Sequence, residues 1–342
     1  MTASVVNKAS RGAESFRFCF TLDTEPDNLW KLASRYTLEH FAFLPDFHKR
    51  LLDAGARPTY LTTSEVVEAP RGRRAMEQCL EAGGCEIGAH FHTWTRAWPF
   101  TVPDLGDPPV PAMAHQLGQE TEERMLDYTC RSLRDALGVE ARSYRGGRWS
   151  LGPESARSLA NCGITVDSSV TPGWSWRDPR DPRLNGPDWT RTRCEISWLT
   201  APADNGRPAI EPGRVLEIPV GAAVFPDALR GLMRSPLARR VCRRVSRSGR
   251  VRLGHFWLRP TTMSLENMRA TMKALERRGC PAWVFMIHSS EIMPCDKLPT
   301  DQAVKAFMRR CVDVTRAAIE LGAEAATLTE CDAWIRRNGY VS

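Results

Sequence analysis

The stretch FRFCFTLDTEPD, residues 16–27, decides the fold class, because an apolar run leads directly into closely spaced acidic residues. The run predicts a strand near 16–23 that ends before Pro26. In an extended strand, Asp23 and Glu25 project to the same side while Thr24 points to the other. The two carboxylates can therefore share one site, although two solvent-facing acids at a strand end would show the same sequence.

Short apolar runs alternate with longer amphipathic stretches through most of the chain, as in βα units around a parallel sheet or barrel. Gly138 and Ser264 stand where a helix end and a helix start are expected. Strands are predicted near 16–23, 58–62, 85–90, 142–146, 164–167, 215–219, 283–287 and 325–328. Helices are predicted near 37–54, 73–83, 114–137, 153–162, 264–279 and 300–321.

The domain organisation follows from the absence of any linker that convincingly splits the 342 residues. We therefore predict one α/β domain over 1–342, with a core at about 15–335. Two stretches rich in Pro, Gly, Asp and Trp, at about 95–113 and 171–214, interrupt the repeat as insertions. Each follows a strand that carries a polar motif, so both are expected to form walls of a substrate cleft.

Composition indicates the cell compartment in which the protein works. The chain is 42% hydrophobic but has no apolar run approaching the ~20 residues that span a bilayer. Residues 1–16 are polar and lack the apolar core of a secretory signal. Eleven cysteines without a C-x-x-C pair indicate reduced thiols and no disulfide framework. We therefore expect a cytoplasmic protein.

Positive charge is concentrated in one segment, 228–265, which contains ten arginines and no acidic residue within a chain of net charge +7. A solvated helix face would explain it, and so would contact with a phosphate-bearing substrate or peripheral contact with an anionic membrane. Nucleic acid is disfavoured because aromatic stacking residues are scarce there. The arginines are Arg230, Arg234, Arg239, Arg240, Arg243, Arg244, Arg247, Arg250, Arg252 and Arg259.

The second polar segment is GAHFHTW, residues 88–94, in which His90 and His92 have the period-two spacing of a strand end. Two histidines and a carboxylate with open positions form a common catalytic arrangement for zinc and related metals. An H-x-H pair alone is a weak signal for metal. Trp94 is expected to form a hydrophobic wall or a sugar-stacking surface.

The third segment is SYRGGRWS, residues 143–150, in which Arg145 and Arg148 bracket two glycines. An arginine at this point can hold the carboxylate of Asp23 ionised and orient it. Either arginine could equally be a surface cation.

The fourth segment is FMIHSSE, residues 285–291, in which His288 follows an apolar strand. A histidine here can donate a proton to a leaving amine, but alone it would suit a structural histidine better. Ser289 and Ser290 lack the G-x-S-x-G elbow of a serine hydrolase.

In their order and spacing, the four segments resemble the polysaccharide deacetylase family, the NodB-type carbohydrate esterases of family 4, over roughly 15–335. The match is nearer to a divergent branch with H-x-H, R-x-G-R-[WY] and I-H-S-S patterns. The resemblance implies an irregular (β/α) barrel of about seven strands. It also implies that Asp23 is the catalytic base, His90 a metal ligand, Arg145 the residue that orients the base, and His288 the general acid.

The sequence departs from the family at the metal site. Thr24 stands where the metal-binding aspartate is expected, and Trp94 where the second histidine would fall. Glu25 and His92, each displaced by about two residues, are the replacements. The implied cofactor is a divalent metal, with zinc preferred over cobalt, nickel or iron.

The predicted function is a metal-dependent hydrolase that removes an acetyl or formyl group from the nitrogen of an amino sugar or glycan precursor. The substrate would include a phosphate- or lipid-linked sugar, and nucleic acid is not expected as a partner. Arg148, Trp149 and Asp167 are further predicted substrate contacts. Two alternatives stay open: a metal-free hydrolase of cyclic amides or imides from the same superfamily, and an inactive glycan- or lipid-binding relative.

Overall fold

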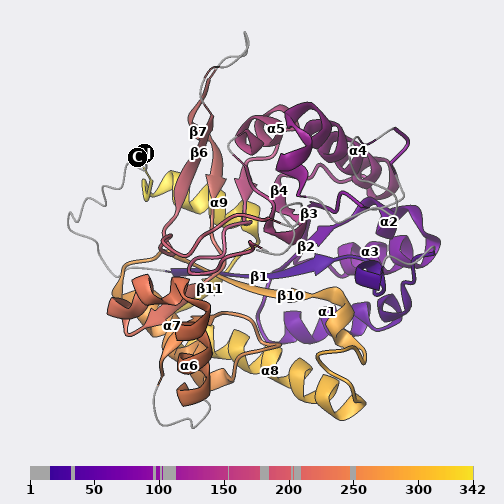
Figure 1. Ribbon diagram of the computed structural model, residues 1–342. Coiled ribbons are helices and arrows are strands. Elements are labelled where there is room, and N and C mark those ends of the chain that lie inside the picture. Colours follow the sequence, from indigo (N-terminus) through magenta and orange to yellow (C-terminus); the bar gives the residue numbers. More distant parts are fainter. Residues whose placement is uncertain are drawn as a thin grey trace.

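The computed structural model describes residues 16–31, 35–94, 98–100, 102, 113–152, 154–177, 185–201, 203, 209–246 and 252–341. They form a mixed α/β fold in which helices surround a largely parallel sheet (Figure 1). Most of the predicted insertion at 95–113 lies outside the described residues. No helix in the described part of the chain is long and apolar enough to cross a membrane.

Among the described residues, seven strands run parallel in the order β10-β1-β2-β3-β4-β5-β7. β6 adds antiparallel to β7, β11 pairs with the start of β1, and β8 and β9 form a separate antiparallel pair. The bounds are β1 Phe16–Thr24, β2 Pro58–Thr62, β3 Glu86–Phe91, β4 Ser143–Gly146, β5 Val166–Asp167, β6 Ser197–Ala201, β7 Ile210–Glu217, β8 Ala222–Phe225, β9 Gly254–Trp257, β10 Ala282–His288 and β11 Ala323–Ala325.

The sheet is curved, so that the chain after β7 meets β10 at the other end of the strand order. The backbone N–H of Gly221, just after β7, donates to the carbonyl of Val284 in β10 over 2.9 Å. Val220 and Val284 form a parallel bridge at the same place. The two ends of the parallel order therefore approach each other, and the sheet acquires an inner and an outer face.

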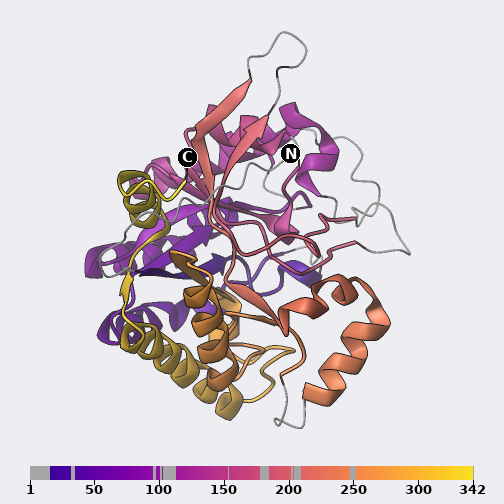
Figure 2. The same ribbon diagram turned by 90° about the vertical axis from the view of Figure 1, so that its left-hand side faces the viewer.

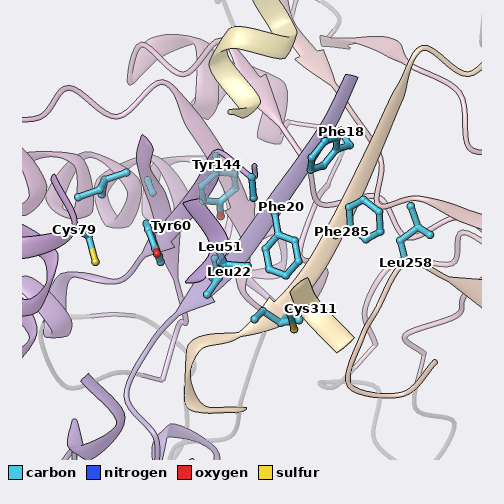
Figure 3. Packing of buried hydrophobic residues seen from close by; sticks show 14 of the residues in the cluster. Phe18, Phe20, Leu22, Leu51, Tyr60, Cys79, Tyr144, Leu258, Phe285 and Cys311 are labelled. Carbon is cyan, nitrogen blue, oxygen red and sulfur yellow. The ribbon is translucent and has the colours of Figure 1, made fainter. Parts of the chain in front are cut away.

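Side-chain alternation along the strands separates the two faces. On β1, Phe18, Phe20 and Leu22 belong to the outer core that packs against the helices, and Cys19 belongs to the inner cluster. Figure 3 shows Phe20 beside Phe285 of β10, and their rings stack with centroids 6.1 Å apart. Because the period is two, Thr21 and Asp23 share the inner face with Cys19.

Most of the helices cover the outer face. Gly138 ends α4 in the left-handed conformation, with φ of 68°, and the Ser264 side chain accepts from the backbone N–H of Asn267 at the start of α7, as predicted. The bounds are α1 Leu44–Asp53, α2 Ser64–Glu68, α3 Pro70–Ala82, α4 Gln119–Leu137, α5 Ser155–Asn161, α6 Pro236–Ser246, α7 Leu265–Arg277, α8 Asp301–Glu320 and α9 Leu328–Arg337. Short 3-10 helices are η1 Leu29–Lys31, η2 Glu39–Ala42, η3 Ala114–Leu117, η4 Gly147–Trp149, η6 Asp227–Arg234 and η7 Ser289–Ile292.

Three segments differ from the expected elements. The stretch 171–214, predicted to be irregular, contains β6 and the start of β7, a pair that projects from the body in Figures 1 and 2. Residues 328–337 form α9, because Leu328, Trp334 and Ile335 bury one face against the inner cluster. Part of the basic segment forms η6 and α6, which join β8 to β9.

Candidate active site

Four polar side chains meet at the carboxyl ends of the parallel strands, on the inner face of the sheet. Asp23 on β1 is in register with His288 on β10, and His90 on β3 is in register with Arg145 on β4. Each of the four lies at or near the carboxyl end of its strand, at the parity that points inward. The structure therefore brings together residues from all four segments that the sequence singled out.

The first cluster consists of Glu25, His90 and His92, all nearly fully buried. His92 Nε2 lies 2.8 Å from Glu25 Oε2 and 3.1 Å from His90 Nε2. His90 Nε2 lies 3.4 Å from the same carboxylate oxygen. Three donor atoms thus converge on one point.

This donor set fits a divalent cation. Donor atoms around a tetrahedral zinc at ~2.1 Å lie about 3.4 Å from one another, close to the separations seen here. Two imidazole nitrogens 3.1 Å apart also repel each other unless a proton or a cation lies between them. His90 Nδ1 donates to the Arg145 carbonyl over 2.6 Å, so its Nε2 keeps a lone pair for the cluster.

Burial and hydrogen bonds shift the pKa values of all three side chains in this cluster. Burial alone would raise the pKa of Glu25, but hydrogen bonds with His90 and His92 lower it well below its ordinary value. Burial opposes the charged form of His90, yet Glu25 and Asp23 raise its pKa. At His92, burial prevails and the pKa is lowered. Trp30 Nε1 donates to Glu25 Oε1 over 3.1 Å, which leaves Oε2 facing the histidines.

The second element is a buried ion pair between Asp23 and Arg145. Arg145 Nη1 donates to Asp23 Oδ1 over 2.6 Å, and its Nε donates to the Ser168 carbonyl over 2.8 Å. Burial would raise the pKa of Asp23, but Arg145, with His90 and His288, lowers it below the ordinary value. Asp23 is therefore an ionised carboxylate, held in place next to the donor cluster.

The third element is His288, whose Nε2 faces both carboxylates at 4.0 Å from Asp23 Oδ2 and 3.9 Å from Glu25 Oε1. On its other side, Nδ1 lies 2.9 Å from Arg259 Nη2 and 3.7 Å from Glu291 Oε1. Glu291 pairs with Arg259 over 3.0 Å, and burial of Glu291 is outweighed by that arginine, so its pKa is lowered. The imidazole is thus held from behind by an ion pair.

Asp23, Glu25, His90, His92 and His288 line a cavity of about 740 Å³. Trp149, Trp176 and Trp257 line the same cavity, and the rings of Trp149 and Trp176 stack with centroids 5.7 Å apart. Arg148 also lines the cavity. Such a volume suits a ligand of sugar size, and the indole faces offer it an apolar wall.

The turn after β4 is shaped by its two glycines. A Cβ on Gly147 would meet the Phe91 carbonyl oxygen at 2.2 Å and His92 Nδ1 at 2.7 Å. Arg148 and Trp149 have positive φ values of 55° and 63°. The close approach lets the turn pack directly against the His92 ring while Arg148 and Trp149 reach the cavity.

Two predicted substrate contacts lie elsewhere. Trp94 is buried, and its ring packs 4.4 Å from that of His92, so it supports the imidazole and does not line the cavity. Asp167 is fully buried and in register with Tyr144, which belongs to the outer core. Strand parity therefore turns Asp167 toward the helices, and burial there raises its pKa.

Ser289 belongs to a buried array that sequence reasoning did not anticipate. Its hydroxyl lies 2.9 Å from His40 Nε2, and His40 Nδ1 lies 3.3 Å from Asp27 Oδ2. The order resembles a serine-hydrolase triad, but Ser289 has no exposed surface and its oxygen accepts the backbone N–H of Glu25 over 3.3 Å. The array therefore anchors the backbone of Glu25.

Sequence reasoning also missed Trp30, Arg259 and Glu291 as parts of the site. Arg259 had been counted with the basic segment, and nothing in that segment distinguishes it from the other arginines. Glu291 carried a usable signal, because it stands three residues after His288 and its Oε2 accepts the backbone N–H of that residue over 3.1 Å.

Comparison with solved structures identifies the fold. A structure from Mycobacterium smegmatis, named as a polysaccharide deacetylase, superposes with a TM-score of 0.56 at 14% identity, covering 99% of this chain and 96% of that one. A family 4 carbohydrate esterase from Streptomyces lividans gives 0.43 at 11%, covering 92% and 94%. A Streptococcus mutans CE4 esterase gives 0.45 at 13%, covering 92% and 86%.

At this identity the first likeness shows a shared fold alone, and the two lower scores add no argument. The sequence matches no protein-family model and no curated protein. The predicted α/β fold, like that of a polysaccharide deacetylase, is confirmed.

Proposed function

We propose that this protein is a metal-dependent hydrolase that removes an acetyl or formyl group from the nitrogen of an amino sugar or glycan precursor, within a divergent H-x-H branch of the deacetylases. The observation that carries the proposal is the convergence of three elements on one cavity: the Glu25, His90 and His92 donors, the Asp23–Arg145 pair, and His288. The shared fold supports the proposal.

Glu25, His90 and His92 would hold the cation. A bound divalent metal would supply Lewis acidity toward the amide carbonyl and lower the pKa of a water molecule. One carboxylate and two imidazoles suit zinc, and they also suit cobalt, nickel or iron. The remaining chemistry belongs to side chains of this chain.

Asp23 would accept the proton that the attacking water loses. It is suited to this because Arg145 keeps it ionised and fixes one of its oxygens, Oδ1, by a 2.6 Å hydrogen bond. The other oxygen, Oδ2, faces His288 across 4.0 Å. The free oxygen is therefore the one available to take the proton.

His288, when both ring nitrogens carry protons, would give the proton on Nε2 to the departing amine as the carbon–nitrogen bond breaks, and the neutral imidazole would remain. Its Nε2 faces the two carboxylates, while Arg259 and Glu291 hold the opposite side of the ring. The acyl group leaves as acetate or formate, and the amine nitrogen gains the proton. Base and acid thus lie 4.0 Å apart, and both line the cavity that would hold the amide.

The substrate would be bound by the tryptophan wall. The faces of Trp149, Trp176 and Trp257 would stack on the apolar face of a sugar ring. Arg148 would meet polar or phosphate groups on the same ligand. We place this activity in the cytoplasm and include lipid-linked sugars among the substrates to be tested.

The proposal is tested by measuring bound metal and amide hydrolysis on the purified chain. We expect about one equivalent of a transition metal in the parent and almost none in the His90→Ala/His92→Ala variant. Asp23→Asn should retain the metal and lose on the order of 10²–10⁴ in the rate of amine release from a panel of N-acetyl and N-formyl amino sugars.

Two matched controls keep the test specific. Half-buried His115 lies outside the cavity lining, so His115→Ala should keep the metal. Asp296 is exposed and lines the cavity but is none of the proposed ligands or proton carriers, so Asp296→Asn should keep most of the rate. Failure to take up zinc, cobalt or nickel, together with hydrolysis of cyclic imides that a chelator does not affect, would exclude the metal-dependent mechanism in favour of the metal-free alternative.

A further inference from the structure

The connection between β8 and β9, formed by η6 and α6, exposes an unusual number of apolar side chains. Among the described residues, seven large hydrophobic side chains are exposed, and four of them lie within 232–245. The exposed fractions are 57% for Leu232, 71% for Leu237, 53% for Val241 and 40% for Val245. Clustering of this kind marks a surface that meets another phase or molecule.

The exposed residues occupy one face of α6. Leu237, Val241 and Val245 follow one another at intervals of four, so they form a stripe along the helix. Attachment to the body uses other residues: Met233 is buried, and Cys242 Cβ lies 3.1 Å from the position of a Cβ on Gly254 of β9. The stripe therefore faces away from the body, and Figure 2 shows α6, in coral, at the edge of the molecule.

Arginines flank the stripe. Arg240 and Arg244 are exposed on the side next to Leu237, and no acidic residue occurs between Ala228 and Leu265. Within the described part of the chain, neither arginine forms an ion pair, whereas Arg252 pairs with Glu266 and Arg259 with Glu291. Glu266 and Glu291 therefore do not neutralise the positive charge of Arg240 and Arg244.

We propose that the η6–α6 segment binds the surface of a bilayer containing anionic lipids, with Leu232, Leu237 and Val241 inserted and Arg240 and Arg244 at the headgroups. An apolar stripe bordered by cations is the pattern of helices that lie in a membrane interface. The arginines attract the negative surface, and the apolar side chains leave water on insertion.

Charge also argues against a second copy of the chain as the occupant. A twofold contact between two such faces would bring Arg240 and Arg244 close to the same residues of the partner. Like charges in contact oppose association, whereas an anionic headgroup layer complements them. The described residues of η6 and α6 do not line the cavity, so binding can be measured independently of hydrolysis.

The test is flotation of the purified full chain with vesicles of phosphatidylcholine, with and without phosphatidylglycerol, in low and high salt. We expect binding to the anionic vesicles that weakens as salt rises. Arg240→Gln/Arg244→Gln should weaken it about thirtyfold, since each of the two arginines near the surface contributes ~1 kcal/mol. Leu237→Ser/Val241→Ser should weaken it at least about tenfold.

The matched controls lie on α8. Arg309 and Arg316 are exposed there, and Ile319 is 44% exposed, so Arg309→Gln/Arg316→Gln and Ile319→Ser remove the same chemistry from another surface. Both should bind vesicles like the parent. Far-ultraviolet circular dichroism checks that each variant is folded.

Three outcomes would overturn the proposal. The first is equal binding to vesicles with and without phosphatidylglycerol. The second is loss of binding in the α8 controls to the same extent as in the α6 variants. The third is a dimer, seen by light scattering without vesicles, that Leu237→Ser/Val241→Ser dissociates, because the stripe would then be a contact between copies.

Discussion

Arg259 Nη2 lies 2.9 Å from His288 Nδ1, and because a guanidinium can only donate hydrogen bonds, this ring nitrogen accepts while the imidazole is neutral. The proton of a neutral imidazole is then on Nε2, the nitrogen that faces Asp23 and Glu25. A residue from the end of the basic segment thus determines which nitrogen of His288 presents a proton to the cavity.

Replacing Arg259 should therefore disturb the proposed proton donor without removing it. We expect Arg259→Ala to lower kcat by roughly tenfold to a hundredfold with a small change in KM, because the ring loses its orientation. Bound metal should stay at the parental level, and Arg259→Lys should restore part of the rate. Arg252→Ala, on the same segment but paired with Glu266, is the control. A rise in KM with an unchanged kcat would show that Arg259 contributes to substrate binding instead.

Ser289→Ala distinguishes an anchoring role from a nucleophile. The change leaves the buried Glu25 N–H and His40 Nε2 without their partner, so we expect a loss of about 1–3 kcal/mol in the free energy of unfolding. Because Ser289 has no exposed surface, amide hydrolysis should persist at a reduced rate. Chemical denaturation and steady-state kinetics measure the two effects, with Ser290→Ala, which lies in the cavity lining, as the comparison. Complete loss of amide hydrolysis in Ser289→Ala or Ser290→Ala would instead support a serine nucleophile.

Gly147→Ala should damage the donor cluster through packing. The added methyl group would overlap the Phe91 carbonyl and the His92 ring, and the backbone oxygen cannot move cheaply. We expect a destabilisation of about 1–3 kcal/mol and weaker metal retention during dialysis against a chelator. Gly231→Ala, where a Cβ meets nothing within 4 Å, is the control. Metal retention equal to that of the parent would mean that His92 does not depend on this contact.

Glu122 should make stability depend on pH. Its carboxyl, on α4, receives hydrogen bonds from Ser155 and Ser158, but burial raises its pKa from 4.5 to about 7, with Asp167 adding to the effect. Between pH 4.5 and about 7, Glu122 is therefore protonated in the folded state and already deprotonated in the unfolded chain. The free energy of unfolding should fall by about 3 kcal/mol as pH rises from about 4.5 through 7, and this contribution should stay constant above.

Glu122→Gln removes the titrating group and should stabilise the protein at pH 8 relative to the parent, with little difference near pH 4.5. Urea denaturation across this range measures the difference, and exposed Glu120→Gln is the control. A parallel pH dependence in the parent and in Glu122→Gln would contradict the assignment.

The site was predictable where strand parity alone determines a side chain's direction. Asp23, His90, Arg145 and His288 each stand at or near the end of a predicted strand, and counting by two along each strand gives the face on which they lie. Asp167 was predicted as a substrate contact, but its direction depends on the register of β5 with β4, which the local sequence does not contain. Arg259 reaches His288 through a contact between segments 29 residues apart that no motif marks.

The η6–α6 segment begins and ends at one place, because Phe225 at the end of β8 is in register with Gly254 at the start of β9. A connection of this kind can be lengthened, shortened or exchanged while the strands on either side keep their pairing. Proteins that share this cavity are therefore free to differ in whether they carry such a segment. Replacing 226–253 by a short turn would produce a form of the protein that lacks the proposed bilayer contact, in which the proposed turnover of dissolved and membrane-held substrates could be compared directly.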